Sequence, residues 1–194
     1  MRILAGAHKG RKLLSPPRGS EGRPITGLAK KSLFDILGGR LDQATVVDLY
    51  CATGTMGLEA LSRGAARCCF AERDPRLLDR LRRNIETLGA AERCVIWRGD
   101  VASHLRGWLN ELCEPVDVAF VDPPYAHSRR WDWQVAGDRI FTPLARRLAD
   151  DGLVVLRVPS GLCPPERIGP LSTRRRRTHG GMTLVLLDRR AEGE

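Results

Sequence analysis

The residues with the clearest chemical role are Asp122-Pro123-Pro124-Tyr125, which follow the apolar run 116–121. This short run is predicted to be a buried strand. The nitrogen of a planar exocyclic amine is a poor nucleophile because its lone pair is delocalised into the ring. Asp122 and the carbonyl of Pro123, held in a stiff turn, can accept its N–H groups while Tyr125 stacks on the ring. The motif therefore indicates methylation of such an amine, with a plain proline turn as the alternative.

The elements that position this motif are predicted from short apolar runs, typical of strands, which alternate with the spacing of apolar residues typical of helices. Strands are predicted over 45–50, 66–71, 94–97, 116–121 and 153–158, and helices over 28–37, 56–63, 75–88, 101–112 and 140–148. Short strands at 3–4 and 13–14 would form a small N-terminal hairpin, and a Gly180-Gly181 turn precedes a last strand over 183–187. Strands that are apolar throughout are typical of a parallel sheet with helices on both faces. We expect an α/β fold with a mainly parallel sheet and an antiparallel C-terminal strand.

Carboxylates stand at the ends of four predicted strands, at Asp48, Glu72, Asp100 and Asp122. The carboxyl ends of parallel strands share one edge of the sheet, where ligands bind. Four unrelated turns would not each require a carboxylate, so we expect these side chains to line one site. Asp48 can bond to the loop that follows it or to an ammonium group of a ligand. Asp100 can bond to an adenine amine, cap the next helix, or do both.

The segment after the first strand is expected to let a ligand approach the backbone. Its residues are small and its glycines permit a tight turn into a helix. It lacks the Gly-x-Gly-x-x-Gly pattern, so an ordinary strand–helix turn is the alternative. Glu72 is expected to bind ribose hydroxyls, whereas Asp74, before Pro75, is expected to cap a helix. The predicted binding residues for an adenosyl-type cofactor are Asp48, Tyr50, Cys51, Thr53, Gly54, Gly57, Glu72, Arg73, Asp100 and Val101.

Positive charge is concentrated near the N-terminus. The chain has a net charge of +9, and residues 1–31 hold eight Lys or Arg against one acid. A basic segment on a nearly neutral body is typical of a protein that binds phosphate backbones, with a solubilising arm as the alternative. We expect a basic nucleic-acid-binding extension over 1–23 and the main domain over 24–194.

Two later segments have open interpretations. The run 126–133 mixes basic and aromatic residues that suit base stacking and phosphate contact, or else forms a loop whose tryptophans cap the core. The run 174–177 is either a phosphate contact or a solvated turn. His127 has no evident chemical partner in the sequence and is interpreted as a bystander.

Export, membrane insertion and metal binding are not indicated by the sequence. The apolar run 3–7 is too short for a signal-peptide core, and no stretch approaches the roughly 18 apolar residues that span a bilayer. The six cysteines form no Cys-x-x-Cys pair and have no histidine at ligand spacing. We expect a cytoplasmic, metal-free monomer with reduced thiols.

The stretch 48–54 running into 57–65, followed by Asp122-Pro123-Pro124-Tyr125, resembles the bacterial RsmD-type enzymes. Segments 5–6, 9–13 and 23–26 resemble the N-terminal pattern of that family, so the likeness covers nearly the whole chain. It implies a Rossmann-like class I methyltransferase fold with a seven-stranded sheet and a small N-terminal hairpin that helps to hold RNA. It also implies that the protein uses S-adenosylmethionine to methylate the N2 amine of one guanine in 16S rRNA, free or in the small ribosomal subunit.

The resemblance and the motif together assign roles to individual residues. Asp122 and the Pro123 carbonyl would orient the amine of a flipped guanine, and Tyr125 would stack on the base. The residues expected to contact RNA are Lys9, Arg11, Lys12, Arg23, Thr26, Lys30, Arg129 and Arg130.

Three departures from the family concern the cofactor loop and the places where RNA would dock. Ala52 stands where a glycine is usual, the run 27–32 lacks an acid, and Gly180-Gly181 replaces an aromatic–glycine pair. A DNA adenine-N6 methyltransferase is one alternative, disfavoured because the short chain has no sizeable target-recognition domain. A non-catalytic RNA-binding or assembly factor is another, disfavoured by the intact carboxylates.

Overall fold

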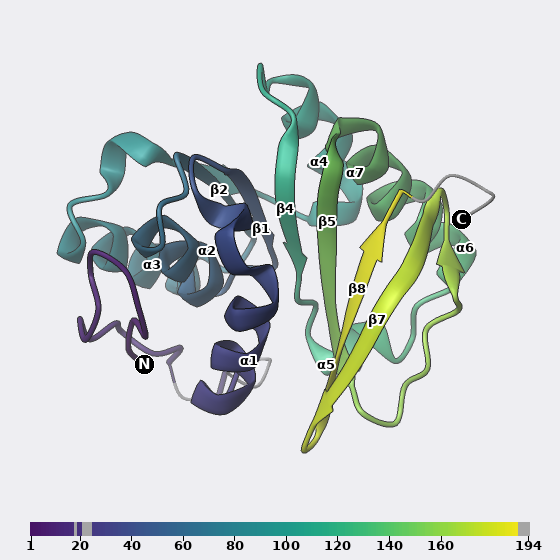
Figure 1. Cartoon of the computed structure of the whole chain (residues 1–194), viewed down its shortest axis with the longest axis horizontal. Helices are drawn as coiled ribbons and strands as arrows, with labels where there is room; N and C mark the ends of the chain where they lie inside the picture. Colours follow the sequence, from purple (N-terminus) through teal and green to yellow (C-terminus); the bar gives the residue numbers. More distant parts are fainter. Residues whose placement is uncertain (18, 21–24, 190–194) are drawn as a thin grey trace.

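The computed structural model describes residues 1–17, 19–20 and 25–189, and a single mixed sheet runs through this part of the chain (Figure 1). Its strands are β1 (Thr45–Leu49), β2 (Arg67–Glu72), β3 (Cys94–Arg98), β4 (Val116–Val121), β5 (Leu148–Pro159), β6 (Arg167–Ile168), β7 (Leu171–His179) and β8 (Met182–Asp188). Their order is β3-β2-β1-β4-β5-β8-β7-β6, with β1 to β5 parallel and the others antiparallel. The α/β fold is as predicted. The described sheet has eight strands instead of seven because the two-residue β6 pairs with β7.

Helices cover both faces of this sheet. One face carries α1 (Gly27–Leu37), α2 (Thr55–Ser62) and α3 (Pro75–Thr87). The other carries α4 (Val101–Asn110), α6 (Trp133–Ala136), the π-helix η3 (Gly137–Phe141) and α7 (Thr142–Arg147). The connections contain α5 (Tyr125–Ser128) and the 3-10 turns η1 (Gly38–Leu41) and η2 (Ala91–Arg93). As predicted, α3 begins at a capping aspartate, because the side chain of Asp74 accepts the Arg76 amide.

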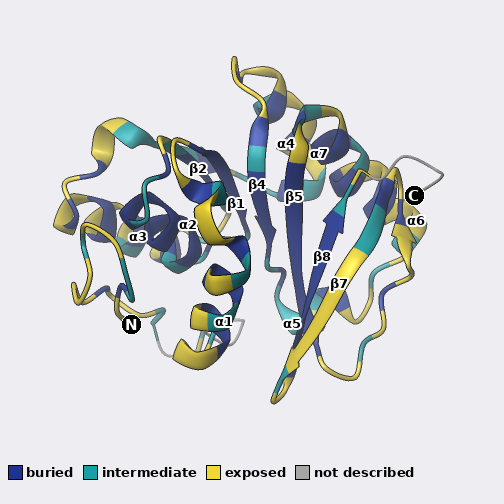
Figure 2. Ribbon diagram, viewed as in Figure 1, coloured by how far each residue is buried: buried dark blue, intermediate teal, exposed yellow. Residues whose placement is uncertain are grey.

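The two faces of the sheet belong to two separate hydrophobic cores. Successive residues of a strand point to opposite faces, so Val46 packs with α1, α2 and α3 while Val47 packs with α4, η3 and α7. Since both faces are covered, the central strands β1 and β4 are buried almost along their whole length (Figure 2). This explains why their sequences are apolar at nearly every position, without a polar alternation.

The N-terminal segment forms one antiparallel bridge, between Arg2 and Lys12, in place of the two predicted strands. Ile3 and Leu13 are buried in the core on the α1–α3 face. Gly6 has φ of +81°, and a Cβ atom there would lie 1.7 Å from the carbonyl oxygen of Ser62, so no side chain fits at this position. The segment is therefore packed directly on α2. The predicted boundary between residues 23 and 24 lies outside the described residues.

The C-terminal hairpin is confirmed, whereas the solvated-turn alternative for 174–177 is wrong and β5 starts earlier than predicted. β7 and β8 pair antiparallel on either side of Gly180-Gly181. The run 174–177 lies inside β7 and not in a turn. β5 begins at Leu148, five residues before the predicted strand 153–158, so residues 150–152 belong to that strand, beside a register shift in β4. Both segments are polar and lack the apolar pattern by which buried strands are recognised in sequence.

Candidate active site

The register of the sheet brings the ends of four parallel strands to one level. Leu49, Ala71, Val121 and Leu156 of β1, β2, β4 and β5 form one row. The next residues along β2, β4 and β5 are Glu72, Asp122 and Arg157. They point to the face that carries α1, α2 and α3, because Phe70, Phe120 and Val155 two positions earlier pack in that core. Asp48 points to the same face, so charged groups from adjacent strands converge at one edge of the sheet.

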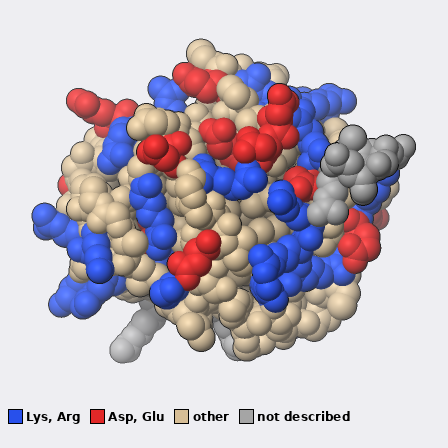
Figure 3. Space-filling view, viewed as in Figure 1, with Lys and Arg blue, Asp and Glu red and all other residues tan. Residues whose placement is uncertain are grey.

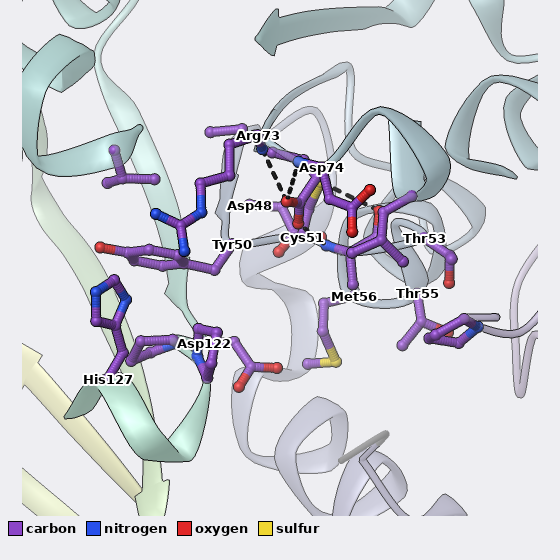
Figure 4. A pocket seen from close by; sticks show the side chains of 18 of the residues that line it. Asp48, Tyr50, Cys51, Thr53, Thr55, Met56, Arg73, Asp74, Asp122 and His127 are labelled. Carbon is purple, nitrogen blue, oxygen red and sulfur yellow. Dashed lines mark hydrogen bonds between the residues drawn. The ribbon is translucent and has the colours of Figure 1, made fainter. Parts of the chain in front are cut away.

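A cavity of about 380 Å³ opens at this edge. Every predicted cofactor-binding residue except Gly54 and Gly57 lines it, as do Asp122 and Pro123. Figure 4 shows side chains from β1, the loop that follows it, the turn after β2 and the turn after β4 gathered around this space. The N-terminal segment closes another side of the cavity with Met1, Pro16, Gly19 and Ile25. The strand-end residues named from sequence are therefore brought together in one site.

The loop between β1 and α2 holds non-glycine residues in the left-handed region. Tyr50 has φ of +59° and Ala52 has φ of +51°, beside Gly54 at +81°. A side chain in this conformation costs roughly 1–2 kcal/mol, so Ala52 keeps the shape that a glycine would adopt without strain. The carboxylate of Glu72 offsets this cost, because Oε2 accepts the Ala52 amide at 3.0 Å and Oε1 accepts the amide of Arg73 at 2.7 Å. Glu72 thus fixes the loop that lines the cavity.

Asp48 is a buried carboxylate with one unmet oxygen. Its Oδ2 accepts the Gly57 amide at 2.8 Å, which is the loop bond predicted from sequence. Its Oδ1 is buried and has no hydrogen-bond partner among the described residues. Burial raises the pKa of Asp48 to about 8, against the opposing effect of the Gly57 amide, and the charge of Asp122 adds to the rise. A positively charged ligand group near Oδ1 would satisfy the oxygen and relieve the repulsion, so the position suits a cation.

Asp100 caps the helix α4 and also lines the cavity. Its side chain accepts the Ser103 amide at the start of α4, which confirms the helix-cap interpretation. It also lines the cavity with Val101 and lies 3.6 Å from a guanidinium nitrogen of Arg73. Capping therefore does not prevent contact between Asp100 and a ligand.

A buried arginine holds the carboxylate of Asp122. The Nε atom of Arg157, on β5, lies 2.5 Å from Asp122 Oδ1, and the two side chains are 8% and 20% exposed. Burial raises the pKa of Asp122, and the charge and hydrogen bond of Arg157 oppose that rise. Within the described residues no hydrogen bond reaches the other oxygen, Oδ2. The pair therefore leaves one carboxylate oxygen of Asp122 without a hydrogen bond from the described residues, in a residue that lines the cavity.

The carbonyl of Pro123, the residue after Asp122 and also part of the cavity wall, is a second candidate acceptor. The carbonyl of Pro124 accepts the amide of His127 at 2.8 Å and so starts α5, whereas no hydrogen bond from the described part of the chain reaches the carbonyl of Pro123. His127 lines the cavity, and its interpretation as a bystander in the chemistry stays a prediction. The ring of Tyr125 is absent from the cavity wall in the described structure; its centroid lies 5.6 Å from the Arg157 guanidinium carbon. Its stacking on a base stays a prediction.

The predicted RNA contacts divide into exposed and structural residues. Lys9, Arg11 and Lys12 are exposed on the N-terminal loop, and Arg129 and Arg130 are exposed after α5. The tryptophans of this second segment cap the core, since the rings of Trp131 and Phe141 meet edge-on at 83° and both tryptophans pack against buried residues.

Lys30 is not placed to contact RNA, so this prediction is wrong. It is buried, with Nζ 2.8 Å from Glu59 Oε2 and donating to the carbonyl of Arg2 at 2.9 Å. Thr26 accepts the Ala29 amide at 3.3 Å and caps α1. Arg23 lies outside the described residues. The composition of the segment indicated charge, but not that Glu59, far along the chain, neutralises part of it.

Sequence reasoning missed Arg157. The signal was present, because one arginine interrupts the otherwise apolar run 153–158. A lone charge in a buried strand requires a partner, and Asp122 is the partner. The contribution of Met1, Pro16 and Ile25 to the cavity had no such signal, because it depends on how the N-terminal segment packs.

No group of three His, Cys, Asp or Glu side chains in the described part of the chain is arranged to hold a metal ion. The cysteines are free, and burial raises the pKa of the Cys69 thiol to about 12. None of the described helices has the length and apolar character needed to cross a membrane.

The mainly parallel sheet with helices on both faces is shared with solved structures. An RNA methyltransferase from Salinibacter ruber, in complex with S-adenosyl-L-homocysteine, has a TM-score of 0.61 at 17% identity, over 89% of this chain and 97% of that chain. A hypothetical protein from Thermus thermophilus has a TM-score of 0.79 at 28% identity, over 97% of this chain and 99% of that chain. The fold is that of the Rossmann-like methyltransferases.

Sequence comparison defines the family within this class. The family model described as conserved hypothetical protein 95 matches residues 1–188. The ribosomal RNA small subunit methyltransferase D of Escherichia coli K12 is 31% identical over 198 residues, covering 100% of this chain and 92% of that protein. The protein of the same name from Haemophilus influenzae is 35% identical over 131 residues, or 64% of each chain. The chain belongs to this family, as the resemblance in its sequence predicted.

Proposed function

We propose that this protein transfers a methyl group from S-adenosylmethionine to the exocyclic N2 amine of a guanine in 16S rRNA. The observation that carries the proposal is the pair of acceptors at the cavity, Asp122 Oδ2 and the carbonyl of Pro123. Two fixed acceptors match the two N–H groups of one amine. The names of the family relatives support rRNA of the small subunit as the substrate.

The residues around the cavity fit S-adenosylmethionine, which supplies a methyl group on a positively charged sulfonium. Asp48 Oδ1, the unmet buried acceptor, suits the positive end of that molecule. A carboxylate has about four acceptor positions. Backbone amides take three of those on Glu72, which leaves one for a ribose hydroxyl. Asp100 and Val101 at the end of β3 would hold the adenine ring.

Asp122 and Pro123 would make the amine nucleophilic by position and charge. Hydrogen bonds from both N–H groups to these acceptors would orient the nitrogen and favour tetrahedral geometry. The amine becomes cationic as the methyl group arrives, and a fixed carboxylate stabilises that charge more strongly in a partly buried site than in water.

Arg157 would act as a positioning residue that keeps Asp122 ionised. A buried carboxyl group tends to hold its proton, and a protonated Asp122 would present a donor to an amine that needs an acceptor. The bond from Arg157 Nε to Oδ1 opposes protonation and would leave Oδ2 available to the substrate amine. The buried ion pair thus sets both the charge and the direction of the carboxylate.

Arg157→Met is expected to move the acidic limb of the pH–rate profile for methylation to higher pH by about 1–3 pH units. Without the cation, burial raises the pKa of Asp122 unopposed, so the inactive protonated form persists to higher pH. Arg157→Lys, which retains the charge, should keep the limb closer to that of the unmodified protein. Initial rates at saturating cofactor across the acidic and neutral pH range test this. An unchanged limb in Arg157→Met would show that Arg157 does not control the protonation of Asp122.

Methyl transfer from labelled cofactor separates this function from its alternatives. We expect label in small-subunit RNA, at the N2 atom of a guanine after nuclease digestion. A DNA adenine-N6 enzyme would label duplex DNA instead, because the same two acceptors can hold that amine. A non-catalytic assembly factor would label neither, and calorimetry would show no binding of S-adenosylmethionine. Free 16S rRNA and intact small subunits, assayed side by side, identify the form of the substrate.

The remaining expectations belong to the same proposal. The exposed residues Lys9, Arg11 and Lys12 would contact RNA from the N-terminal extension, and Arg129 and Arg130 would do so beside the Asp-Pro-Pro-Tyr turn. A protein with this substrate would work in the cytoplasm, and we expect it to act as a monomer without a metal ion.

A further inference from the structure

β7 carries four consecutive arginines, and only two of them are neutralised within the described residues. Arg174 lies 3.4 Å from Asp188 Oδ2, and Arg176 lies 2.6 Å from Glu166 Oε1 and donates to the carbonyl of Pro164 at 2.8 Å. Arg175 and Arg177 are exposed and form no ion pair or side-chain hydrogen bond with any other described residue. The strand therefore separates its charges into a paired set and an unpaired set.

The unpaired set points to the same face of the sheet as the active-site carboxylates. Arg177 pairs in register with Leu184 of β8, which pairs with Arg157 of β5. Side chains in one such row point to one face, so Arg177 lies on the face of Arg157 and Asp122, two strands from the cavity. With strands about 4.8 Å apart, this separates the backbones of Arg177 and Arg157 by roughly 10 Å. Arg175 lies in the next row on this face, opposite Leu186.

The chemistry of this surface fits a polyanion. An arginine fork that is exposed and unpaired can bind a phosphate with two hydrogen bonds. The apolar residues of β8 beneath it are buried, and the large exposed apolar side chains of the described chain (Leu14, Leu28 and Val135) lie on other elements. A protein partner would need an apolar patch of the kind that the hairpin lacks. The surface formed by Arg175 and Arg177 therefore offers a partner positive charge without an apolar patch.

The position of this surface complements that of the N-terminal loop. The N-terminal segment packs on α2, beside β1 and β2, whereas β7 lies beyond β5 and β8 at the other end of the sheet. Figure 3, viewed from the α1 side, shows basic side chains over β7 on the right and others at the lower left, near the N-terminal loop. The cavity lies between these two basic surfaces along the strand order.

We propose that Arg175 and Arg177 bind the phosphate backbone of the RNA substrate on the side of the cavity opposite the N-terminal loop. The inference rests on the proposed function for the identity of the polyanion. An RNA strand held on both sides of the cavity would present one nucleotide to Asp122, and each held phosphate would release counterions on binding.

The test compares two variants that remove the same charge from the same strand. In Arg175→Gln/Arg177→Gln, the dissociation constant for small-subunit RNA at about 0.1 M salt should rise by about 10-fold, and the slope of log affinity against log salt should fall by about 2. Arg174→Gln/Arg176→Gln, which loses only paired arginines, should change either quantity far less. Arg175→Lys/Arg177→Lys should restore most of the affinity. Affinity for S-adenosylmethionine, unchanged in each variant, confirms an intact fold.

RNA binding and methylation test the two proposals separately. Equal effects of the two double variants would overturn the proposal, since general electrostatics would then explain both. An unchanged RNA affinity in Arg175→Gln/Arg177→Gln would also overturn it. If the unmodified protein binds RNA and transfers no methyl group, the proposed function fails, and the binding comparison still decides the role of Arg175 and Arg177. When methylation occurs, the first variant should raise KM for RNA and leave kcat at saturating RNA nearly unchanged.

Discussion

Asp122→Asn is expected to lower the rate of methyl transfer by about 10²–10³-fold while S-adenosylmethionine still binds. The amide oxygen can still accept the bond from Arg157, so the substitution preserves the contact seen at Oδ1. That orientation replaces Oδ2 with an NH₂ group, and a donor then faces the N–H groups of the substrate amine. The negative charge that would stabilise the cationic amine is lost as well. Single-turnover transfer with saturating RNA measures the chemical step directly.

Asp117→Asn is the matched control for this substitution. Asp117 lies near the start of β4, the strand that Asp122 follows, and its Oδ2 accepts the Thr45 amide at 2.7 Å. Like Asp122→Asn, the substitution Asp117→Asn converts a hydrogen-bonded carboxylate to an amide, but it does so far from the cavity. The rate of methyl transfer should therefore stay close to that of the unmodified protein. Near-normal transfer by Asp122→Asn with bound cofactor would refute the role assigned to Asp122.

Glu59→Ala is expected to lower the free energy of unfolding by about 3–5 kcal/mol. The carboxylate of Glu59 is fully buried and pairs with Lys30 at 2.8 Å and with Arg63 at 3.0 Å. It also accepts the amides of Leu4 and Ala5, at 2.8 and 3.0 Å. Its removal leaves the ammonium group of Lys30 buried without its partner and frees two amides of the N-terminal segment. Equilibrium unfolding in urea, followed by circular dichroism, measures the loss.

Asp35→Ala provides the comparison for Glu59→Ala. Asp35 pairs with Lys31 at 2.7 Å on α1, but both side chains are more than half exposed. Exposed pairs of this kind contribute about 0.3–0.5 kcal/mol, so this variant should unfold close to the unmodified protein. A similarly small effect of Glu59→Ala would mean that Glu59 does not anchor the N-terminal segment to α2.

The order of the central strands and helices could be predicted because each has a local cause. The apolar runs of β1 and β4 are nearly continuous since helices cover both faces of the sheet, and Asp74 and Asp100 mark helix starts by capping them. β7 could not be predicted in this way. Its exposed arginines carry no apolar pattern, and only its pairing with β8 makes it a strand.

The sequence could predict those residues of the candidate site that lie at the ends of strands. Asp48 and Glu72 lie at or near the ends of apolar strands and Asp122 directly follows one, and parallel pairing alone brings them to one edge. Lys30 was misassigned because its environment depends on Glu59, a residue from another helix. His127 and the residues of the N-terminal segment reach the cavity through packing, which has no periodic signal in the sequence.

The Asp122–Arg157 pair limits which sequences this fold can accept. Loss of either partner alone leaves the other charge buried without compensation, whereas replacement of both by well-packed apolar residues is often neutral or stabilising. Positions 122 and 157 should therefore change together as the family diverges. A family member that loses the activity can become more stable by replacing both residues, whereas a member that keeps the activity must retain both buried charges.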